Sequence, residues 1–277
     1  MINKINPFRY NASKRVMMLM SGTMIAQVIP VAISPILTRI YSPEEFGILA
    51  LYLAILAIVS VLATMRYELA IVQPKKDEDA KALLHLCLAI SVVMTFFLFI
   101  CVFAYRLFEF NWFDNPGSDL LLYLLPISFF LNGFVLSFRY WLLRQNQYGK
   151  MSGVSVVQSG GTGASQVTNG LLQVQNGLVY GQVLGQLLAS IYMIVASLKT
   201  DKAIFRGYSW SLLKRQADTF INMPKYSLIG AFADKLATQL PVLFITRVFG
   251  SALTGYFSLT FRVLNLPLVA LSGAISQ

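Results

Sequence analysis

Long stretches without a charged residue alternate with short polar segments along the whole chain. A helix that crosses a bilayer needs about 20 consecutive apolar residues, whereas barrel strands alternate in polarity over about ten residues. The runs have the first pattern, and the longest one, 151–198, contains a turn signal at 174–177 that divides it. The pattern predicts an all-α polytopic membrane protein. We expect eight spans, at 14–39, 45–73, 80–106, 119–144, 150–173, 177–198, 225–248 and 253–277.

The composition excludes a water-soluble domain. Hydrophobic residues make up 56% of the chain and charged residues only 12%, whereas soluble domains carry about 25% charged residues. The first apolar run, 16–38, follows several basic residues and resembles a signal peptide in that respect. It is longer than the apolar region of a signal peptide, which has about 7–15 residues, so we expect a retained first span.

The net charge of +10 could indicate nucleic-acid binding, but the positions of the basic residues argue against it. At the ends of the predicted spans and between them, fifteen Lys and Arg residues fall on the side that holds the N-terminus and three fall on the other side. Cytoplasmic loops of membrane proteins carry such an excess. The sequence therefore predicts a cytoplasmic N-terminus, with the lipid bilayer rather than nucleic acid as partner.

A short motif occurs twice, each time at the non-cytoplasmic end of a predicted span. TRIY at 38–41 is followed by Gly47, and TRVF at 246–249 is followed by Gly255, so the copies are 208 residues apart (247 minus 39). Many transporters consist of repeated halves. The spacing predicts a six-helix lobe at 1–199, a cytoplasmic linker at 200–223 and the beginning of a second lobe at 224–277. Because a second lobe of equal size would extend further, we expect a C-terminal truncation.

The linker contains one segment with mixed character. Residues 208–220, YSWSLLKRQADTF, combine Trp, Leu and Phe with Lys and Arg. This combination is typical of an amphipathic helix that lies on a membrane surface. A flexible basic linker is the alternative.

Two long stretches resemble a known family. SGTMIAQVIPVAISPILTRIYSPEEFGILALYLAI at 21–55, followed by RYELAIVQPKKDEDA at 66–80, resembles the start of bacterial polysaccharide-biosynthesis flippases. These are the oligosaccharide or O-antigen repeat-unit translocases of the multidrug/oligosaccharidyl-lipid/polysaccharide exporter superfamily. MPKYSLIGAFADKLATQLPVLFITRVFG at 223–250 resembles the start of the second lobe in the same family. The resemblance covers nearly the whole chain.

The resemblance implies a fold and a function. It implies two six-helix lobes around a central cavity, and alternating access that carries a polyprenyl-pyrophosphate-linked oligosaccharide across the inner membrane. It implies no cofactor, although transport could be coupled to a H⁺ or Na⁺ gradient. Other polysaccharide-assembly proteins are expected as partners.

Four cations within the predicted spans are the first candidates for substrate binding: Arg66, Arg139, Lys235 and Arg262. A charge at the bilayer centre costs about 2.5–3.5 kcal/mol on insertion scales, so such residues usually have a function. Arginine matches phosphate oxygens with two parallel hydrogen bonds, and lysine offers a point charge. We expect these residues to line a cationic cavity. The alternative is structural ion pairing or snorkelling to the membrane surface.

Two carboxylates, Asp234 and Glu68, also fall within the predicted spans. Each could bind a proton or Na⁺ and couple transport to an ion gradient, or could form a structural ion pair. Arg66 and Glu68 are two residues apart in a predicted continuous helix. Residues at that spacing lie on different faces, so we expect that they are not partners.

Two further arginines, Arg39 and Arg247, end their spans on the non-cytoplasmic side at equivalent positions of the repeat. They are candidates for an outer gate, with interfacial anchoring as the alternative.

Small residues indicate a close helix contact. The segment 159–165, SGGTGAS, lies in the fifth span, and Gly177, Gly181 and Gly185 follow at four-residue spacing in the sixth. Such spacing is typical of membrane helices whose backbones approach closely. A helix broken at 160–163 is a second interpretation.

Two other function classes remain as alternatives. A membrane enzyme of envelope polysaccharide synthesis would need convergent acid, base or nucleophilic groups, and the short outer loops carry no such cluster, so we expect no enzyme. A drug or metabolite exporter of the same superfamily is the other alternative. His85 is the only histidine, and no metal site is expected.

Overall fold

A computed structural model describes residues 7–107, 119–200, 204 and 209–275. No strand occurs in these ranges, so the all-α prediction is confirmed. A 3-10 turn, η1 (Tyr67–Ala70), and a π-helical turn, η2 (Met223–Ser227), accompany the α-helices. The α-helices are α1 (Pro7–Ile40), α2 (Pro43–Ser60), α3 (Asp77–Leu107), α4 (Asp119–Arg144), α5 (Tyr148–Leu171), α6 (Gly177–Thr200), α7 (Trp210–Thr219) and α8 (Leu228–Ile275).

Six of the described helices are long and apolar enough to cross a membrane: α1, α2, α3, α4, α6 and α8. The protein is therefore a multi-pass helical membrane protein. The predicted fifth span exists as α5, but its Gly, Ser, Thr and Gln residues make it less apolar than the six helices that could cross a membrane. Neighbours compensate for this polarity, because α5 packs against both α1 and α6.

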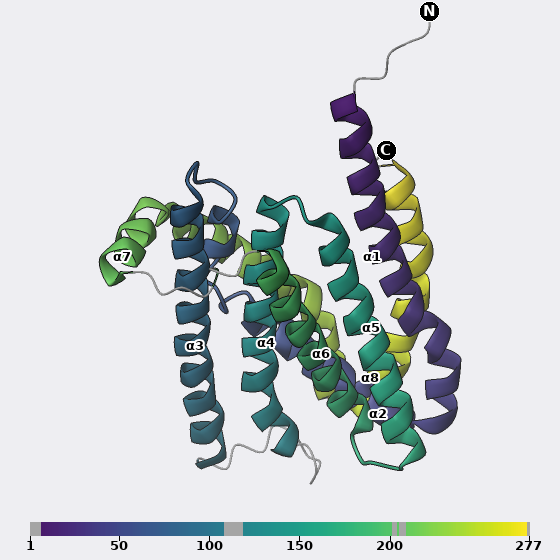
Figure 1. Ribbon diagram of the computed structural model, residues 1–277. Coiled ribbons are helices and arrows are strands. Elements are labelled where there is room, and N and C mark those ends of the chain that lie inside the picture. Colours follow the sequence, from purple (N-terminus) through teal and green to yellow (C-terminus); the bar gives the residue numbers. More distant parts are fainter. Residues whose placement is uncertain (1–6, 108–118, 201–203, 205–208, 276–277) are drawn as a thin grey trace, which may run out of the picture.

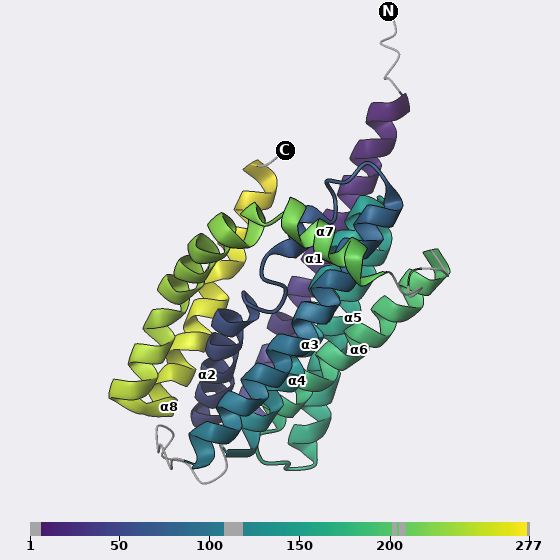
Figure 2. The same ribbon diagram turned by 90° about the vertical axis from the view of Figure 1, so that its left-hand side faces the viewer.

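The predicted seventh and eighth spans are the two halves of α8. Gly250 interrupts that helix with φ 84° and ψ 176°, a backbone conformation that glycine adopts without strain. Residues 228–249 form the first half, residues 251–275 form the second half, and the chain reverses between them (Figure 2). Gly250 occupies the repeat position of Ser42, which caps α2 after the α1–α2 corner. The two copies of the motif thus form the same corner.

The helices form two layers (Figures 1 and 2). One layer has the order α3, α4, α6, α5 and α1, and α2 packs behind it against α4 and α6. α8 then packs along the other side of α2. The upper end, as the molecule lies in Figure 1, holds residues 61–76 and the α4–α5 turn. The lower end holds the α1–α2 turn, the α5–α6 turn and the turn within α8.

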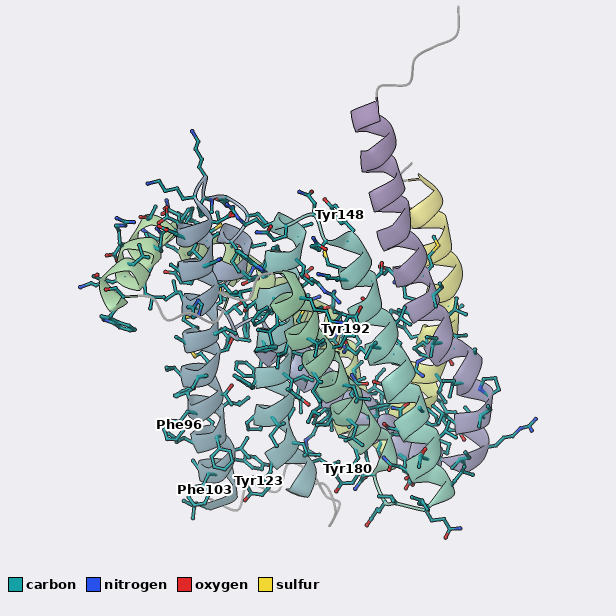
Figure 3. The ribbon with its side chains drawn as sticks, in the orientation of Figure 1. Phe96, Phe103, Tyr123, Tyr148, Tyr180 and Tyr192 are labelled. Atoms are coloured by element: carbon teal, nitrogen blue, oxygen red, sulfur yellow. The ribbon has the colours of Figure 1, made fainter. Side chains whose placement is uncertain are left out.

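Buried apolar side chains form two clusters, one toward each end. The upper cluster contains Ile71, Leu83 and Trp141, and the lower cluster contains Phe46 and Phe129. Large apolar side chains also cover the outside, where α3 exposes aromatic rings to the surroundings (Figure 3). Phe96 and Phe103, for example, point away from the helix bundle. An apolar outer surface over a packed interior fits helices that face lipid.

The small residues of α5 and α6 bring the two backbones together, as the sequence predicts. Gly181 lies against Gln166 of α5, and Gly185 lies against Thr162. The Gln166 side chain crosses the contact and donates from Nε2 to the carbonyl oxygen of Leu178 at 2.9 Å. The interpretation of a helix broken at 160–163 is wrong, because α5 is continuous there.

The predicted amphipathic helix in the linker is present as α7, so residues 210–219 are not a flexible linker. It packs across the beginning of α3 at the upper end (Figure 2). Gln216 Nε2 donates to Asp79 Oδ1 at 2.6 Å, and Arg215 pairs with the same oxygen at 3.2 Å. Trp210 remains exposed on the outer side.

Tyr41 fastens the α1–α2 corner to α5, and its removal gives a first prediction. Its hydroxyl donates to the carbonyl oxygen of Gln166 at 2.7 Å in a buried position. Burial, together with the charge of Glu45, raises the pKa of Tyr41 to about 12, so the phenol stays protonated and able to donate at neutral pH. We expect Tyr41→Phe to lower the free energy of unfolding by about 1 kcal/mol. Thermal unfolding in detergent would measure this, and unchanged stability would contradict it.

Candidate functional site

The chain between α2 and α3 departs from the predicted second span. α2 ends at Ser60, and residues 61–76 form turns that contain only the short helix η1. Met65 and Arg66 have positive φ angles of 48° and 66°, which a continuous helix does not allow. The prediction of a helix through 45–73 is therefore wrong from residue 61 onward. Arg66 and Glu68 instead lie in an irregular segment at the upper end.

This turn makes Arg66 and Glu68 partners, which corrects the expectation that they are not. Arg66 Nη1 lies 3.3 Å from Glu68 Oε1. The second carboxylate oxygen accepts a hydrogen bond from the Thr64 hydroxyl. Only 1% of the Glu68 side chain is exposed, against 29% for Arg66. The carboxylate is thus buried and paired, whereas its arginine reaches toward the surface.

Arg66 also connects the irregular segment to the beginning of the second repeat. Its Nε donates to Ser227 Oγ at 3.2 Å, and Ser227 is the last residue of η2, directly before α8. The Tyr67 hydroxyl donates to the carbonyl oxygen of Ala217 in α7 at 3.2 Å. The segment therefore contacts both the linker helix and the entry to α8.

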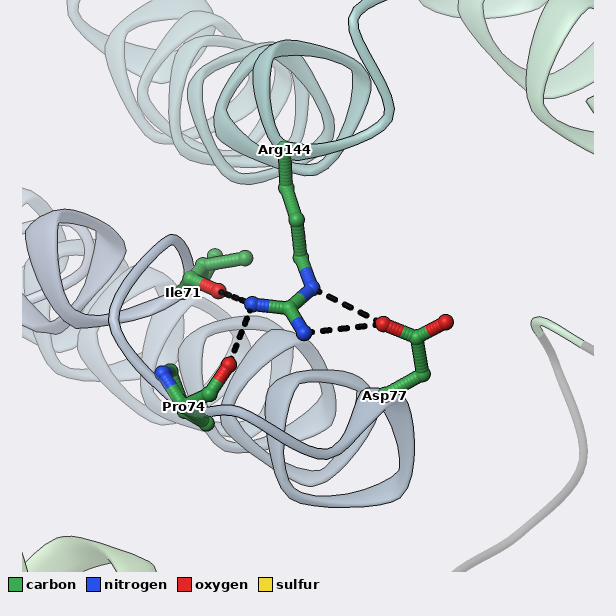
Figure 4. A network of polar contacts seen from close by, with 4 residues as sticks. All are labelled: Ile71, Pro74, Asp77 and Arg144. Atoms are coloured by element: carbon green, nitrogen blue, oxygen red, sulfur yellow. Dashed lines mark hydrogen bonds and ion pairs between the residues drawn. The ribbon is translucent and has the colours of Figure 1, made fainter.

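Arg144, at the end of α4, holds the other side of this segment (Figure 4). Its Nε and Nη2 both donate to Asp77 Oδ1, at 3.1 and 2.8 Å. Its Nη1 donates to the carbonyl oxygen of Pro74 at 2.7 Å and approaches that of Ile71 at 3.5 Å. These bonds satisfy carbonyl groups that an ordinary helix would have paired. Arg144 is a structural residue that fixes the path of the chain into α3.

Arg139, one and a half turns earlier in α4, has a different environment. Its Nη2 donates to Ser155 Oγ of α5 at 3.2 Å. Its Nε is buried and has no hydrogen-bond partner within the part of the chain that the structure describes. No described carboxylate pairs with it. A guanidinium inside a membrane helix bundle with an unused donor is unusual, because such groups are normally paired.

The irregular segment lies next to the helix that carries Arg139. Arg66 directly precedes η1, and η1 packs against α4. Two of the four predicted cations, Arg66 and Arg139, thus belong to one region at the upper end.

The other predicted residues lie elsewhere. Asp234 and Lys235 are exposed on the first half of α8, and neither has a polar contact with another described side chain. Arg262 is half-buried on the second half of α8. The structure does not bring these three together with Arg66 and Arg139. A role of any of the four cations in binding substrate remains a prediction.

Arg39 and Arg247 both lie exposed at the lower end, one before each of the two equivalent corners. Neither makes an ion pair with a described residue. Their equivalent positions fit the prediction of an outer gate and equally the alternative of interfacial anchoring.

A double-mutant cycle would test the Arg66–Glu68 pair. We expect Arg66→Met alone to lower the free energy of unfolding by about 3 kcal/mol, because it leaves the buried Glu68 carboxylate without its cation. The double variant Arg66→Met/Glu68→Met should recover most of that loss. Chemical unfolding in detergent would measure the cycle. Additive losses would show that the two side chains do not interact.

Sequence reasoning missed the polar partners Thr64, Ser155 and Ser227. Hydroxyl groups are common in membrane helices, so none of them differs from its neighbours in the sequence. One signal was present: Arg66 and Glu68 fall within a few residues of Pro74, where a helix is expected to end. A segment that leaves the helix before the proline can turn its charges toward each other.

The arrangement presents guanidinium donors in one region. Arg139 has an unused donor, and Arg66 shares its guanidinium between a carboxylate and a hydroxyl. Guanidinium donors match the oxygens of phosphate or carboxylate groups. Among the described residues, no group of three His, Cys, Asp or Glu side chains could hold a metal ion.

Comparison with known proteins gives one match. A family model described as polysaccharide biosynthesis protein matches residues 36–277. No curated protein and no solved structure matches the chain. The match includes both copies of the motif, the irregular segment with Arg66 and Glu68, and all of α8. The chain therefore belongs to the polysaccharide biosynthesis protein family, as a multi-pass helical membrane protein.

Proposed function

We propose that this protein is a flippase that moves polyprenyl-pyrophosphate-linked oligosaccharide units across the inner membrane by alternating access. Membership in a polysaccharide biosynthesis family supports a sugar substrate. Sugars assembled on a lipid carrier must cross the bilayer before they are used outside, and a multi-pass helical protein suits that task. The repeated helix corner supports a transporter built from related halves.

The single observation that carries the proposal is the buried Nε of Arg139, which has no hydrogen-bond partner among the described residues and belongs to the helix against which η1, next to Arg66, packs. A pyrophosphate group concentrates negative charge on adjacent phosphates. Arg139 has a free donor for one phosphate oxygen, and Arg66 could exchange its carboxylate partner for another. The same charges would repel cationic drugs, so a drug exporter fits less well.

The distribution of basic residues supports an orientation with the upper end in the cytoplasm. Arg39, Arg106 and Arg247 are the described basic residues at the lower end. The upper end carries Lys75, Lys76, Lys81, Arg144, Lys150, Lys199, Lys214, Arg215 and Lys225. In this orientation the Arg66–Arg139 region would receive the carrier lipid from the inner leaflet, where it is loaded.

Other residues complete the proposal. Lys235 and Arg262 would contact substrate when α8 faces a second lobe. Asp234 or Glu68 would bind the H⁺ or Na⁺ whose gradient drives transport. No bond is made or broken in this scheme, so the protein would act as a transporter and not as an enzyme. Other polysaccharide-assembly proteins would deliver and take up the lipid-linked sugar.

A flipping assay in proteoliposomes would test the function. The probe is a short-chain polyprenyl pyrophosphate that carries a fluorescent disaccharide, and quenching from one side reports which leaflet holds it. We expect movement to require the protein and to fall at least about tenfold in Arg66→Ala, which loses a charge-assisted contact. Lys214→Ala, an exposed cation of α7, is the matched control and should flip normally. Absence of protein-dependent movement would overturn the proposal.

A further inference from the structure

Residues related by the repeat contact each other where α2 crosses the second half of α8. Gly47 lies against the carbonyl group of Ser251, and Gly255 lies against the carbonyl group of Pro43. Ser251 is the repeat equivalent of Pro43, and Gly255 is the equivalent of Gly47, since both pairs differ by 208. The same contact thus occurs twice with the roles exchanged. Such reciprocity is the mark of a two-fold related interface.

Both positions require glycine because the backbones approach closely. A Cβ on Gly47 would collide with the Ser251 carbonyl, and a Cβ on Gly255 would collide with the Pro43 carbonyl. In each case the obstacle is backbone, which cannot rotate away as a side chain can. Gly160 and Gly230 differ from them, since a Cβ at either position would meet nothing within 4 Å.

The crossing is also the point at which α8 is most firmly enclosed. Among the described side chains of α8, only Thr254 and Gly255 are buried. No side-chain hydrogen bond joins α2 to α8 among the described residues. At the opposite, upper end, the entry to α8 is held by the bond from Arg66 to Ser227. α8 therefore packs along α2 without side-chain hydrogen bonds to it among the described residues, with its closest backbone approach at the lower end and a polar contact at the upper end.

We propose that the Gly47–Gly255 crossing is a releasable closure between the two repeats at the lower end. The inference rests on the proposed function, because alternating access requires one end to open while the other stays shut. A contact made of backbone packing without hydrogen bonds separates without leaving buried polar groups unpaired. Glycines let the closed state form, and separation of α2 from α8 opens the lower end. The corners at Ser42 and Gly250 lie next to the crossing, where they can take up the change in angle.

The variants that test this are single alanine substitutions. Gly47→Ala and Gly255→Ala each add one methyl group that the closed contact cannot accommodate. Gly160→Ala and Gly230→Ala add the same group in open space, and Gly230 lies in α8 itself. Alanine is a better helix former than glycine, so none of the four weakens the helix that carries it.

The measurement is the distance between spin labels on either side of the crossing. Labels would be placed at Glu44→Cys and Leu253→Cys, both exposed, after Cys87→Ala and Cys101→Ser remove the native thiols. Pulsed electron–electron double resonance on the full chain in nanodiscs should show two distances between the labels, a short one in most molecules and a long one in a minority. We expect Gly47→Ala and Gly255→Ala to raise the ratio of the long-distance population to the short-distance population by about tenfold. Because both substitutions act on one contact, the double variant should raise this population ratio no further than either single variant.

The outcomes separate this inference from the proposed function. Distances in Gly47→Ala and Gly255→Ala that equal those of Gly160→Ala and Gly230→Ala would overturn the closure. A short distance that persists while lipid flipping falls would also overturn it, since the glycines would then serve packing alone. If the distances shift as expected but the wild-type protein moves no lipid-linked sugar, the closure stands and the proposed substrate fails.

Discussion

Replacing Arg139 with methionine should nearly abolish transport and at the same time make the protein harder to unfold. The side chain bonds only Ser155 among the described residues, and its buried Nε has no partner. Such a charge stabilises little in the empty protein, because its desolvation is not repaid by an ion pair. We expect Arg139→Met to raise the free energy of unfolding by about 1–3 kcal/mol. Loss of the phosphate contact should lower flipping by about 100-fold, equivalent to about 3 kcal/mol.

Arg144→Met is the matched control on the same helix. Arg144 bonds Asp77 and the Pro74 carbonyl, so its removal should lower the free energy of unfolding by about 1–2 kcal/mol. Flipping should fall far less than in Arg139→Met. We therefore expect opposite changes in stability from the two substitutions, which unfolding in detergent would measure. Flipping in proteoliposomes would measure their effects on transport. A loss of stability in Arg139→Met, with transport intact, would mean that Arg139 is a packing residue.

The sequence was sufficient for the fold because a membrane limits what a chain can do. Each apolar run must form a helix, since backbone groups in lipid have no other partner. This rule correctly predicted both ends of α1, α3, α4 and α6 to within a few residues, apart from an N-terminal extension of α1 to Pro7. It also placed a break next to Gly250. The small-residue spacing correctly predicted the contact of α5 with α6.

The candidate site was less predictable because it lies where the helix rule does not apply. Residues 61–65 belong to the charge-free run 46–65, yet the chain leaves the helix there, and the positive φ angles at Met65 and Arg66 follow no residue preference. Arg66 and Glu68 were therefore placed on separate faces of a helix that does not exist. Arg139 was identified as a candidate from its charge alone. That it lacks a partner is a property of α4 packed on α5, which depends on three-dimensional contacts.

The close contact of α5 with α6 gives a further prediction of a large effect on stability. A Cβ on Gly185 would lie 2.7 Å from the backbone nitrogen and 2.8 Å from the Cβ of Thr162. The nitrogen belongs to the helix backbone, so the two helices must move apart to admit a methyl group. We expect Gly185→Ala to lower the free energy of unfolding by about 2–3 kcal/mol. Gly181→Ala should act similarly, because its Cβ would approach the backbone nitrogen of Gln166.

Gly160→Ala is the control, since it adds the same methyl group to α5 where no atom lies within 4 Å. Its free energy of unfolding should stay equal or rise by up to about 1 kcal/mol, as expected from helix propensity. Unfolding midpoints of the three alanine variants in one detergent would measure the difference. Equal stability of Gly185→Ala and Gly160→Ala would show that α5 and α6 separate at little cost. Separation would also strain the bond from Gln166 Nε2 to the carbonyl oxygen of Leu178, so the loss in Gly185→Ala should shrink once Gln166 is replaced by alanine.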